Sequence, residues 1–318
     1  MSYSNTPYDD VYRTMEIECI QLMIPLINEM FDKNYSLTEK IISLRNEHFV
    51  LQEDCEKEER ITDSCIMLGD DIYHIECQST PDGTMALRMF EYDFKIALER
   101  SQLEKHILKI RFPKSAVLYL RSTPSTPDQL TVIMETPGGT ITYQMPVLKM
   151  QDYSLEDIFA KKLYFLIPFY LFTFEQNFGT MEEDEEQLNI LKQEYNTIAE
   201  KLEELVSSGE ISEFEKVTIT EMIRNIADNL AKNHQKVRKG VTDIMGGKVL
   251  NYPARETYYT GFNAGRVKGT IEGETKKGMI CYLNATTRGM SHEDALAIAD
   301  ITEGEAATAL SLRKEGKL

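Results

Sequence analysis

The sequence predicts an α/β domain whose first elements follow the order αβββαβ, and an α-helical region after it. Three observations support this prediction. Apolar residues recur at helical spacing over residues 11–30 and again over residues 84–108. Short segments rich in β-forming residues lie between and after these helices. Beyond residue 175 the apolar residues recur every three or four positions, which is typical of helices.

The first predicted helix has one apolar side, formed by Val11, Met15, Cys19, Leu22, Leu26 and Met30. Such spacing indicates a helix that packs on a core. Pro25 lacks a backbone N–H, so we expect a kink near that residue. Residues 48–52 follow as the predicted first strand of the sheet.

The next two predicted strands, residues 60–67 and 72–78, flank a turn at residues 68–71. The Gly-Asp pair in this turn is a hairpin signal, and a two-residue or four-residue loop centred there fixes the same register. In that register Asp63 lies directly opposite Glu76. Side chains alternate along a strand, so both carboxylates share one face of the hairpin.

Two carboxylates in this position repel each other. Cross-strand partners have Cβ atoms about 4.5–5.5 Å apart, and like charges at that distance destabilise a sheet unless a positive group lies between them. A divalent cation is one such group, and two oxygen ligands suit Mg²⁺ or Mn²⁺. His74 and Gln78 share the face of Asp63 and Glu76. The alternative is a pair that is solvated or held by Lys and Arg side chains.

The second core helix is predicted over residues 84–108 and is followed by a strand over residues 116–121. Arg88 and Tyr92 are four residues apart on this helix, so they project from one face. Both are candidates to support the carboxylates or to contact a phosphate. The alternatives are core packing for Tyr92 and a structural ion pair for Arg88.

A second hairpin, residues 130–135 and 140–147, turns at residues 137–139, and Ser154 is the predicted N-cap of a further helix. The most apolar stretch, residues 163–174, is too short to span a bilayer, so we expect a buried helix and no membrane partner.

The five cysteines are an odd number without a tight metal-ligand spacing, which indicates a reduced, cytoplasmic protein. Cys65 faces His74 in the predicted register while Cys77 points away, which argues against zinc. The net charge of −17 is unfavourable for DNA binding. The charge is polarised, however: residues 175–215 hold thirteen acids and two bases, and residues 231–279 hold ten bases and four acids. Solvated helix surfaces would also explain these segments.

Two heptad seams predict an antiparallel helical hairpin beyond residue 178. Gly209 is the expected C-cap of the first helix, and Ser212 and Glu215 form the capping box of the second. Such seams close on themselves or recruit a second copy, and we expect a homo-oligomer, most simply a dimer. The seam residues are Leu188, Leu191, Tyr195, Ile198, Leu202 and Leu205, then Ile219, Ile223, Ile226, Leu230, Asn233 and Val237.

Near the C-terminus a glycine recurs at every fourth position from Gly261 to Gly273, which favours close helix packing over an exposed helix. Three short helices are predicted after it, over residues 279–287, from the cap Ser291 through Ala299, and from the cap Thr302 onward. We interpret them as an interaction module, with a helix-turn-helix as the alternative.

The predicted organisation is therefore an α/β domain over residues 1–178, a helical hairpin over residues 179–250 and a glycine-striped helix with a small helical module over residues 251–318.

The series Asp63, Glu76 and Gln78 resembles the D…E-x-K core of PD-(D/E)XK nucleases. It is most similar to the E-x-Q form in the Rpn family of recombination-promoting nucleases and transposases. Further similar stretches lie at residues 7–13, 46–49, 60–63, 73–79, 88–93, 112–117 and 166–169.

The resemblance implies a Mg²⁺-dependent DNA endonuclease that acts in mobile-element recombination or defence. Asp63 and Glu76 would be its metal ligands, and Gln78 takes the position of the usual lysine. Because glutamine carries no charge, slow turnover, or none, is expected. Two alternatives are a non-catalytic nucleic-acid-binding or protein-interaction scaffold with the same fold, and a purely structural helical assembly protein.

Overall fold

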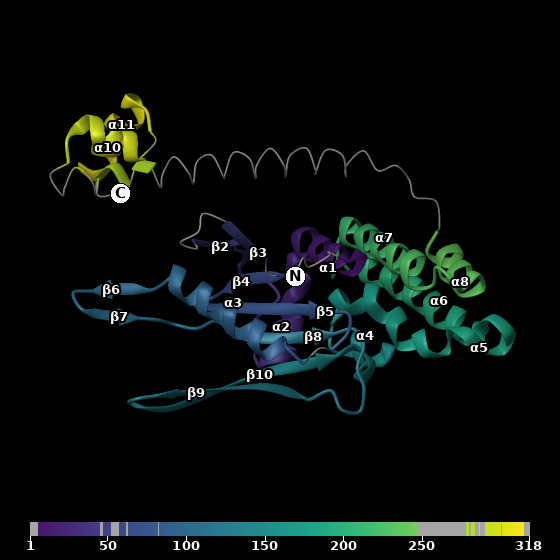
Figure 1. Ribbon diagram of the computed structural model, residues 1–318. Helices are drawn as coiled ribbons and strands as arrows, with labels where there is room; N and C mark the ends of the chain where they lie inside the picture. Colours follow the sequence, from purple (N-terminus) through teal and green to yellow (C-terminus); the bar gives the residue numbers. More distant parts are fainter. Residues whose placement is uncertain are drawn as a thin grey trace. The chain divides into compact units, whose positions relative to one another are not determined.

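The computed structural model describes residues 6–44, 47–51, 57–61, 63–81, 83–246, 278–279, 281–283, 286, 290–299 and 301–314. The chain divides into two compact units, Met1–Lys248 and Val249–Leu318. The first unit is an α/β unit, as predicted (Figure 1). Its helices are α1 (Pro7–Glu18), η1 (Ile20–Leu22), α2 (Met23–Phe31), α3 (Met85–Glu99), η2 (Met150–Asp152), α4 (Leu155–Ala160), η3 (Tyr164–Asn177), α5 (Phe178–Glu183), α6 (Glu185–Ser207), α7 (Glu213–Leu230) and α8 (Gln235–Met245).

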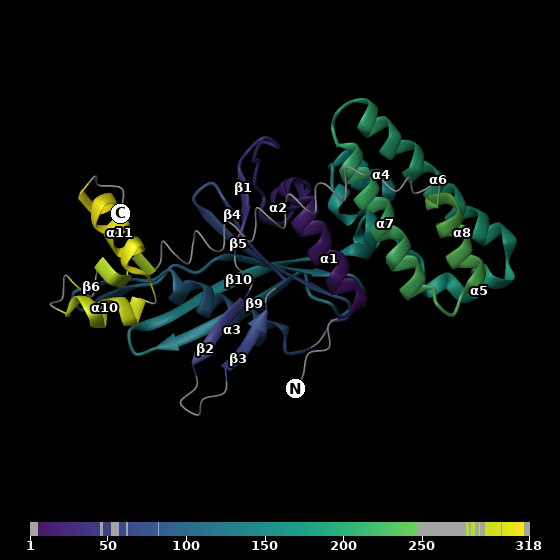
Figure 2. The ribbon, with the colours of Figure 1, turned by 90° about the horizontal axis from the view of Figure 1, so that it is seen from above.

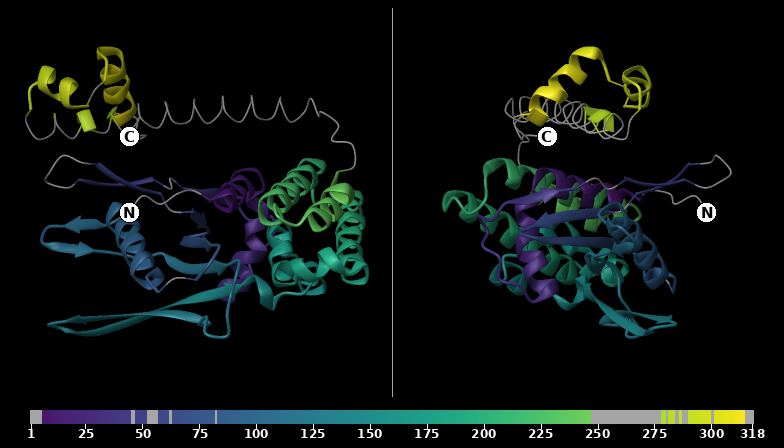
Figure 3. Two further views of the ribbon diagram at one scale, coloured as in Figure 1. Left: turned by 45° about the vertical axis from the view of Figure 1, so that its right-hand side comes forward. Right: turned by 90° about the vertical axis from the view of Figure 1, so that its left-hand side faces the viewer.

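A six-stranded mixed sheet is the centre of this unit, with the order β1-β4-β5-β8-β10-β9. β5 and β8 are parallel, as are β8 and β10, while the other neighbours are antiparallel. The β6–β7 and β9–β10 hairpins extend on the same side of the unit (Figure 3). The strands are β1 (Ile41–Ser43), β2 (Glu47–Leu51), β3 (Lys57–Ile61), β4 (Ser64–Leu68), β5 (Asp71–Gln78), β6 (Gln102–Glu104), β7 (Ile107–Lys109), β8 (Lys114–Tyr119), β9 (Gln129–Thr136) and β10 (Gly139–Lys149).

Helices cover both faces of the sheet. Tyr73, Ile75 and Cys77 of β5 belong to the large core that includes α1, α2 and the helices beyond residue 154. On the other face, Met85 and Met89 of α3 pack in a smaller core with β8 and β10. α1 lies between the sheet and α7 (Figure 2). The carboxyl end of β5 is therefore enclosed by α1 on one face and α3 on the other.

The turn and cap predictions are confirmed. β4 and β5 pair in the expected register, with Cys65 opposite His74. Gly69 in their turn has a φ of 60°, a conformation that favours glycine. Ser154 caps α4, and Ser212 and Glu215 form the capping box of α7. The hairpin of β9 and β10 and the strand β8 also lie where they were expected.

The first predicted helix is in fact two helices. α1 ends at Glu18, a short 3-10 turn follows, and α2 begins at Met23. Pro25 is the third residue of α2, and because it has no N–H it cannot bond back to the preceding turn. The proline therefore sits at the start of a new helix, and the break lies before it.

Two further boundaries were wrong. Residues 48–52 were predicted as the first core strand, but β2 pairs only with β3 in a separate sheet, and β1 takes the edge of the central sheet beside β4. The helix predicted to reach residue 108 ends at Glu99. The β6–β7 hairpin follows, turning at Lys105 with a φ of 56°. The apolar residues of this hairpin continue the helical spacing of α3, which is why the sequence predicted a longer helix.

Most of the seam residues are buried within the chain itself, whereas Leu205 and Leu230 are half-buried and Asn233 is exposed. Leu191, Ile198 and Ile223 belong to the same core as the sheet residues. α7 ends at Leu230, so Val237 belongs to α8 and the second seam is interrupted. These buried positions are not available to a second copy. A dimer remains a prediction and would need another surface.

Residues 163–172 are buried as expected, but the stretch from Tyr164 onward belongs to the 3-10 helix η3 and not to an α-helix. The core runs without interruption from the sheet into α6, α7 and α8. The predicted boundary near residue 178 remains a prediction. Among the residues that the structure describes, no helix is long and apolar enough to cross a membrane.

The second unit contains α10 (His292–Ala299) and α11 (Glu303–Lys314). Residues 278–279, 281–283 and 286 are also helical, in agreement with the predicted helix. Thr302 and Glu305 form the expected capping interactions. Its core combines alanines such as Ala295 and Ala306 with the larger side chains of Met279, Tyr282 and Leu283. The glycine stripe from Gly261 to Gly273 lies outside the described residues.

The continuous core predicts that the sheet and α7 unfold together. Ile223 is fully buried in that core, and an Ile→Ala truncation there costs about 2–5 kcal/mol. Ile223→Ala should therefore lower the urea midpoint of β5 and α7 equally, as measured by hydrogen exchange and mass spectrometry. Ile190→Ala, at an exposed position of α6, is the matched control. Loss of protection in α7 while β5 stays protected would show two independent parts.

Candidate functional site

Asp63, the residue before β4, and Glu76, near the end of β5, lie together. The backbone N–H of Asp63 donates to Oε1 of Glu76 at 3.1 Å. The backbone N–H of Cys77 donates to Oδ2 of Asp63 at 3.0 Å. Both residues are buried, with exposed fractions of 6% and 1%. The hairpin therefore brings the two carboxylates together as the register predicted.

The pair is electrostatically strained. Burial raises the pKa of Asp63 well above its usual value, and the nearby Glu76 and Asp9 carboxylates raise this pKa further. The Cys77 N–H and Arg13 act in the opposite direction. Burial and the neighbouring carboxylates therefore disfavour the charged form of Asp63, and a nearby positive group favours it.

Two arginines approach this pair from different helices. Nη2 of Arg13, on α1, lies 3.6 Å from Oδ1 of Asp63. Nη2 of Arg88, on α3, lies 3.6 Å from Oε2 of Glu76. Their side chains are 24% and 13% exposed. Each carboxylate thus has its own cationic partner, so the structure contains the ion pairs that the sequence left as an alternative.

Gln78 is tied to one of these arginines. Nη1 of Arg88 donates to Oε1 of Gln78 at 3.2 Å. A guanidinium group can only donate hydrogen bonds, so this contact fixes the amide with its oxygen toward Arg88. The Gln78 oxygen is therefore engaged by a cation.

A buried hydrogen-bonded chain supports Glu76 from behind. Nε2 of His74 lies 3.1 Å from Oε1 of Glu76, and Nδ1 lies 2.7 Å from Oδ1 of Asp93. Burial opposes a charged imidazole, but the bonds to Asp93 and Glu76 outweigh it and raise the pKa of His74 to about 10. At neutral pH the imidazolium donates to both carboxylates. The ring of Tyr92 packs edge-on against His74 at a centroid distance of 5.8 Å.

Asp93 was missed by the sequence analysis. Its carboxylate is fully buried and also accepts hydrogen bonds from Ser115 Oγ at 2.6 Å and from the Tyr143 hydroxyl at 3.4 Å. A signal for it existed: Asp93 is an acid four residues after Met89, within the apolar stripe of α3. A buried carboxylate in such a stripe requires polar partners.

The donor set suits a hard cation and not zinc. No group of three or more His, Cys, Asp or Glu side chains that could hold a metal occurs in the described part of the chain. Mg²⁺ is usually bound by one or two carboxylates, with waters and substrate phosphates completing its shell. Asp63 and Glu76 fit that pattern. Burial raises the pKa of the Cys65 thiol to about 12, which disfavours the thiolate that zinc requires.

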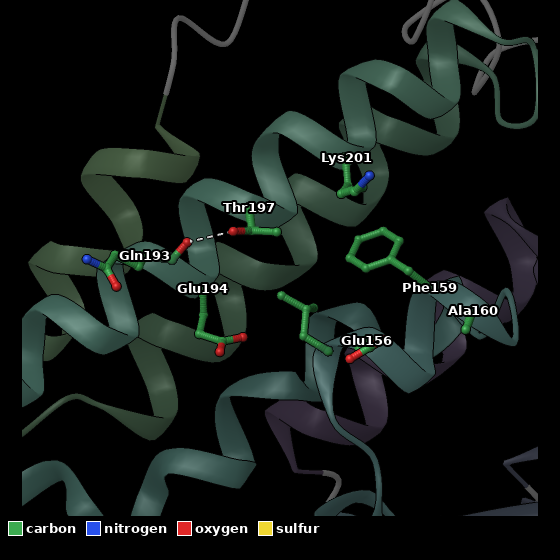
Figure 4. Close-up of a pocket in the computed structure, with 8 residues that line it drawn as sticks. Glu156, Phe159, Ala160, Gln193, Glu194, Thr197 and Lys201 are labelled. Carbon is green, nitrogen blue, oxygen red and sulfur yellow. Dashed lines mark hydrogen bonds between the residues drawn. The ribbon is translucent and has the colours of Figure 1, made fainter.

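A pocket lies between α4 and α6, with a volume of about 580 Å³ (Figure 4). Its polar groups are partly engaged, since Thr197 Oγ1 donates to the Gln193 carbonyl at 3.0 Å and Glu194 accepts from the Tyr170 hydroxyl at 3.2 Å. None of the six predicted site residues lines it.

All six predicted residues lie around the carboxyl end of β5. The backbone of Asp63 bonds to Glu76, and Arg88 contacts both Glu76 and Gln78. His74 bonds to Glu76 from the other side, and Tyr92 packs against His74. Comparisons with protein-family models, curated proteins and solved structures find no match.

The raised pKa of Asp63 predicts a pH-dependent effect of Asp63→Asn. An unfolded aspartate titrates near pH 3.9, so between that pH and its raised native pKa the native state binds more protons. Stability due to this group therefore falls as pH rises through that window. In EDTA, Asp63→Asn should unfold at higher urea than wild type at neutral pH, and the gap should close near pH 4. If the wild type were more stable than Asp63→Asn at neutral pH, the inferred repulsion at Asp63 would be wrong.

Proposed function

We propose that this chain is a divalent-metal-dependent endonuclease that hydrolyses phosphodiester bonds in DNA. The observation that carries the proposal is the buried Asp63–Glu76 pair at the end of β5, in which the backbone N–H of Asp63 donates to the Glu76 carboxylate. The strand order supports it as well: α1 and α2 precede β1, β4 and β5 of the central sheet, and α3 and β8 follow. This is the αβββαβ order implied by the resemblance to PD-(D/E)XK nucleases and the Rpn family.

The chain's own residues prepare the carboxylates for this role. The Cys77 N–H orients Asp63, and the His74 imidazole orients Glu76. Such partners of metal-binding carboxylates fix ligand geometry. A Mg²⁺ or Mn²⁺ ion held by Asp63 and Glu76 would polarise a phosphoryl oxygen and lower the pKa of an attacking water.

The reaction is hydrolysis. The water oxygen forms a new bond to phosphorus while one ester oxygen leaves, and the water proton is finally taken up by that leaving oxygen. The products are a phosphomonoester and a hydroxyl. Asp63 and Glu76 are not consumed, and Arg13 and Arg88 supply positive charge beside the negatively charged phosphate.

DNA contact must rest on such local charge, because the whole chain carries a net charge of −17. A role in mobile-element recombination or defence rests on the family resemblance. A cytoplasmic location rests on cysteine usage, and a homo-oligomer remains a proposal that concerns a surface other than the buried seams.

A second candidate function is a non-catalytic scaffold that binds nucleic acid or protein. The ion pairs of Arg13 with Asp63 and Arg88 with Glu76 favour it, because they already neutralise both acids. In that case the site needs no metal.

Supercoiled plasmid cleavage separates the two candidates. With Mg²⁺ or Mn²⁺ the wild type should nick or cut the plasmid, and EDTA should stop it. Asp63→Asn should lower the rate at least about 100-fold, the loss typical of removing one transition-state-stabilising group. It should remain folded.

Asp70→Asn, an exposed acid in the turn before β5, should cleave like wild type when purified identically. Full activity of Asp63→Asn would rule out the mechanism. DNA binding by the wild type without cleavage under any metal would favour the scaffold.

A further inference from the structure

Exposed apolar side chains gather on α3 and on the β6–β7 hairpin that follows it. Among the residues that the structure describes, fourteen large hydrophobic side chains are exposed, and six of these lie between positions 87 and 108. Single exposed apolar residues are common on protein surfaces, whereas a group of them marks an interaction site. This part of the first unit is therefore a candidate interface.

The outer side of α3 carries an apolar stripe. Leu87, Phe94 and Leu98 are spaced by seven and four residues, so they lie along one side of the helix. Half-buried Phe90 lies between them, and its ring stacks on Phe94 at a centroid distance of 6.2 Å. The ring of Phe112, which follows β7, stacks on Phe90 at 6.2 Å. The hairpin therefore starts just after this stripe and returns to it.

The β6–β7 hairpin has one apolar face that its own strands leave uncovered. Leu103 and Leu108 are directly opposite each other in the register, with exposed fractions of 72% and 50%. Glu104 and Lys109 share the other face, where they form an ion pair at 3.0 Å. In the described part of the chain this hairpin pairs with no third strand. A two-stranded hairpin alone is marginally stable in water, so a cover on its apolar face would stabilise it.

We propose that this surface binds a second copy of the chain and forms a two-fold symmetric dimer. The surface, called here the α3–hairpin patch, consists of Leu87, Phe94, Leu98, Leu103 and Leu108. In a two-fold dimer the same patch lies on both sides of the contact, so each copy covers the apolar residues of the other. This inference does not depend on the proposed hydrolysis.

The size of the patch matches the need of such a dimer. Its five side chains have exposed fractions between 39% and 72%. They offer on the order of 400–650 Å² of apolar area, because a large side chain presents roughly 150–250 Å². A standard interface buries about 800 Å² per partner, of which a little more than half is apolar. The patch therefore supplies the apolar part of one standard interface.

The charges beside the patch also permit two copies to meet. Lys109 is paired with Glu104 at 3.0 Å and Arg111 with Asp71 at 2.9 Å, so these cations are neutralised within each copy. Lys105 lies at the hairpin turn. When two hairpins lie side by side in opposite directions, their Lys105 side chains are at opposite ends and do not repel each other.

Duplex DNA suits this patch less well than a second copy. Protein–DNA interfaces are more polar and more positively charged than protein–protein interfaces. The centre of the patch is formed by leucines and a phenylalanine, and two of the cations near it already have acidic partners. The apolar composition therefore favours a protein surface.

Sedimentation equilibrium of the full chain, whose mass is 36.6 kDa, should show a dimer in the micromolar range. Leu103→Asp should raise the dimer Kd at least about 100-fold, because each dimer loses two buried leucines. Leu87→Asp, at a 61% exposed position in the first turn of α3, should act in the same direction. Both variants should keep the Tm of the monomer, because surface substitutions change stability little. Ile190→Asp, at a 43% exposed position of α6, is the matched control and should dimerise like wild type.

Hydrogen exchange on the wild type tests the same contact without a substitution. The amides of β6 and β7 should exchange more slowly at high protein concentration than at low concentration, because the dimer covers them. The amides of α6 should exchange equally at both concentrations. If a variant does not fold, this experiment still decides the proposal.

Three outcomes would overturn the inference. The first is a wild type that stays monomeric throughout the micromolar range, with hairpin exchange that does not vary with concentration. The second is a dimer that neither Leu103→Asp nor Leu87→Asp weakens, because its contact must then lie elsewhere. The third is a monomeric wild type whose binding to a labelled DNA duplex is weakened by Leu103→Asp, which would assign the patch to DNA.

Discussion

The structure depends on the burial of two opposed carboxylates, Asp63 and Glu76. Taking such groups out of water is costly unless hydrogen bonds and opposite charges compensate. Backbone N–H groups of Asp63 and Cys77 provide part of this compensation. The His74 imidazole and two guanidinium groups provide the rest. Without a binding function, a pair of apolar residues would serve this hairpin better.

The compensating groups come from elements far apart in the chain. α1 supplies Arg13, and α3 supplies Arg88 and Asp93. α1 in turn is packed against α7, where the hydroxyl of Thr218 donates to Glu18 at 2.8 Å. The helices beyond residue 178 therefore contribute to the placement of the site through a shared core. The many acidic residues at positions 175–215 are compatible with a structural role for these helices in supporting α1.

Local signals in the sequence were sufficient for the register of β4 and β5, because one turn fixes the register of a hairpin. They were also sufficient for the helix caps at Ser154 and Ser212. Local signals could not predict the contacts of Arg13 and Asp93, because these contacts form only when α1 and α3 pack on the sheet. The sequence also could not show which short strand joins the central sheet. No local signal distinguishes an edge strand such as β1 from a strand of the separate β2–β3 hairpin. Heptad spacing likewise does not show what covers a seam.

The central claim is that Asp63 and Glu76 together bind one divalent cation. Diffraction from crystals soaked in Mn²⁺, with data collected at the manganese absorption edge, tests it most directly. The account predicts a single anomalous peak in contact with oxygens of both carboxylates, with Arg13 and Arg88 moved away from them. No peak at this position, with both arginines still paired to the acids, would contradict the claim.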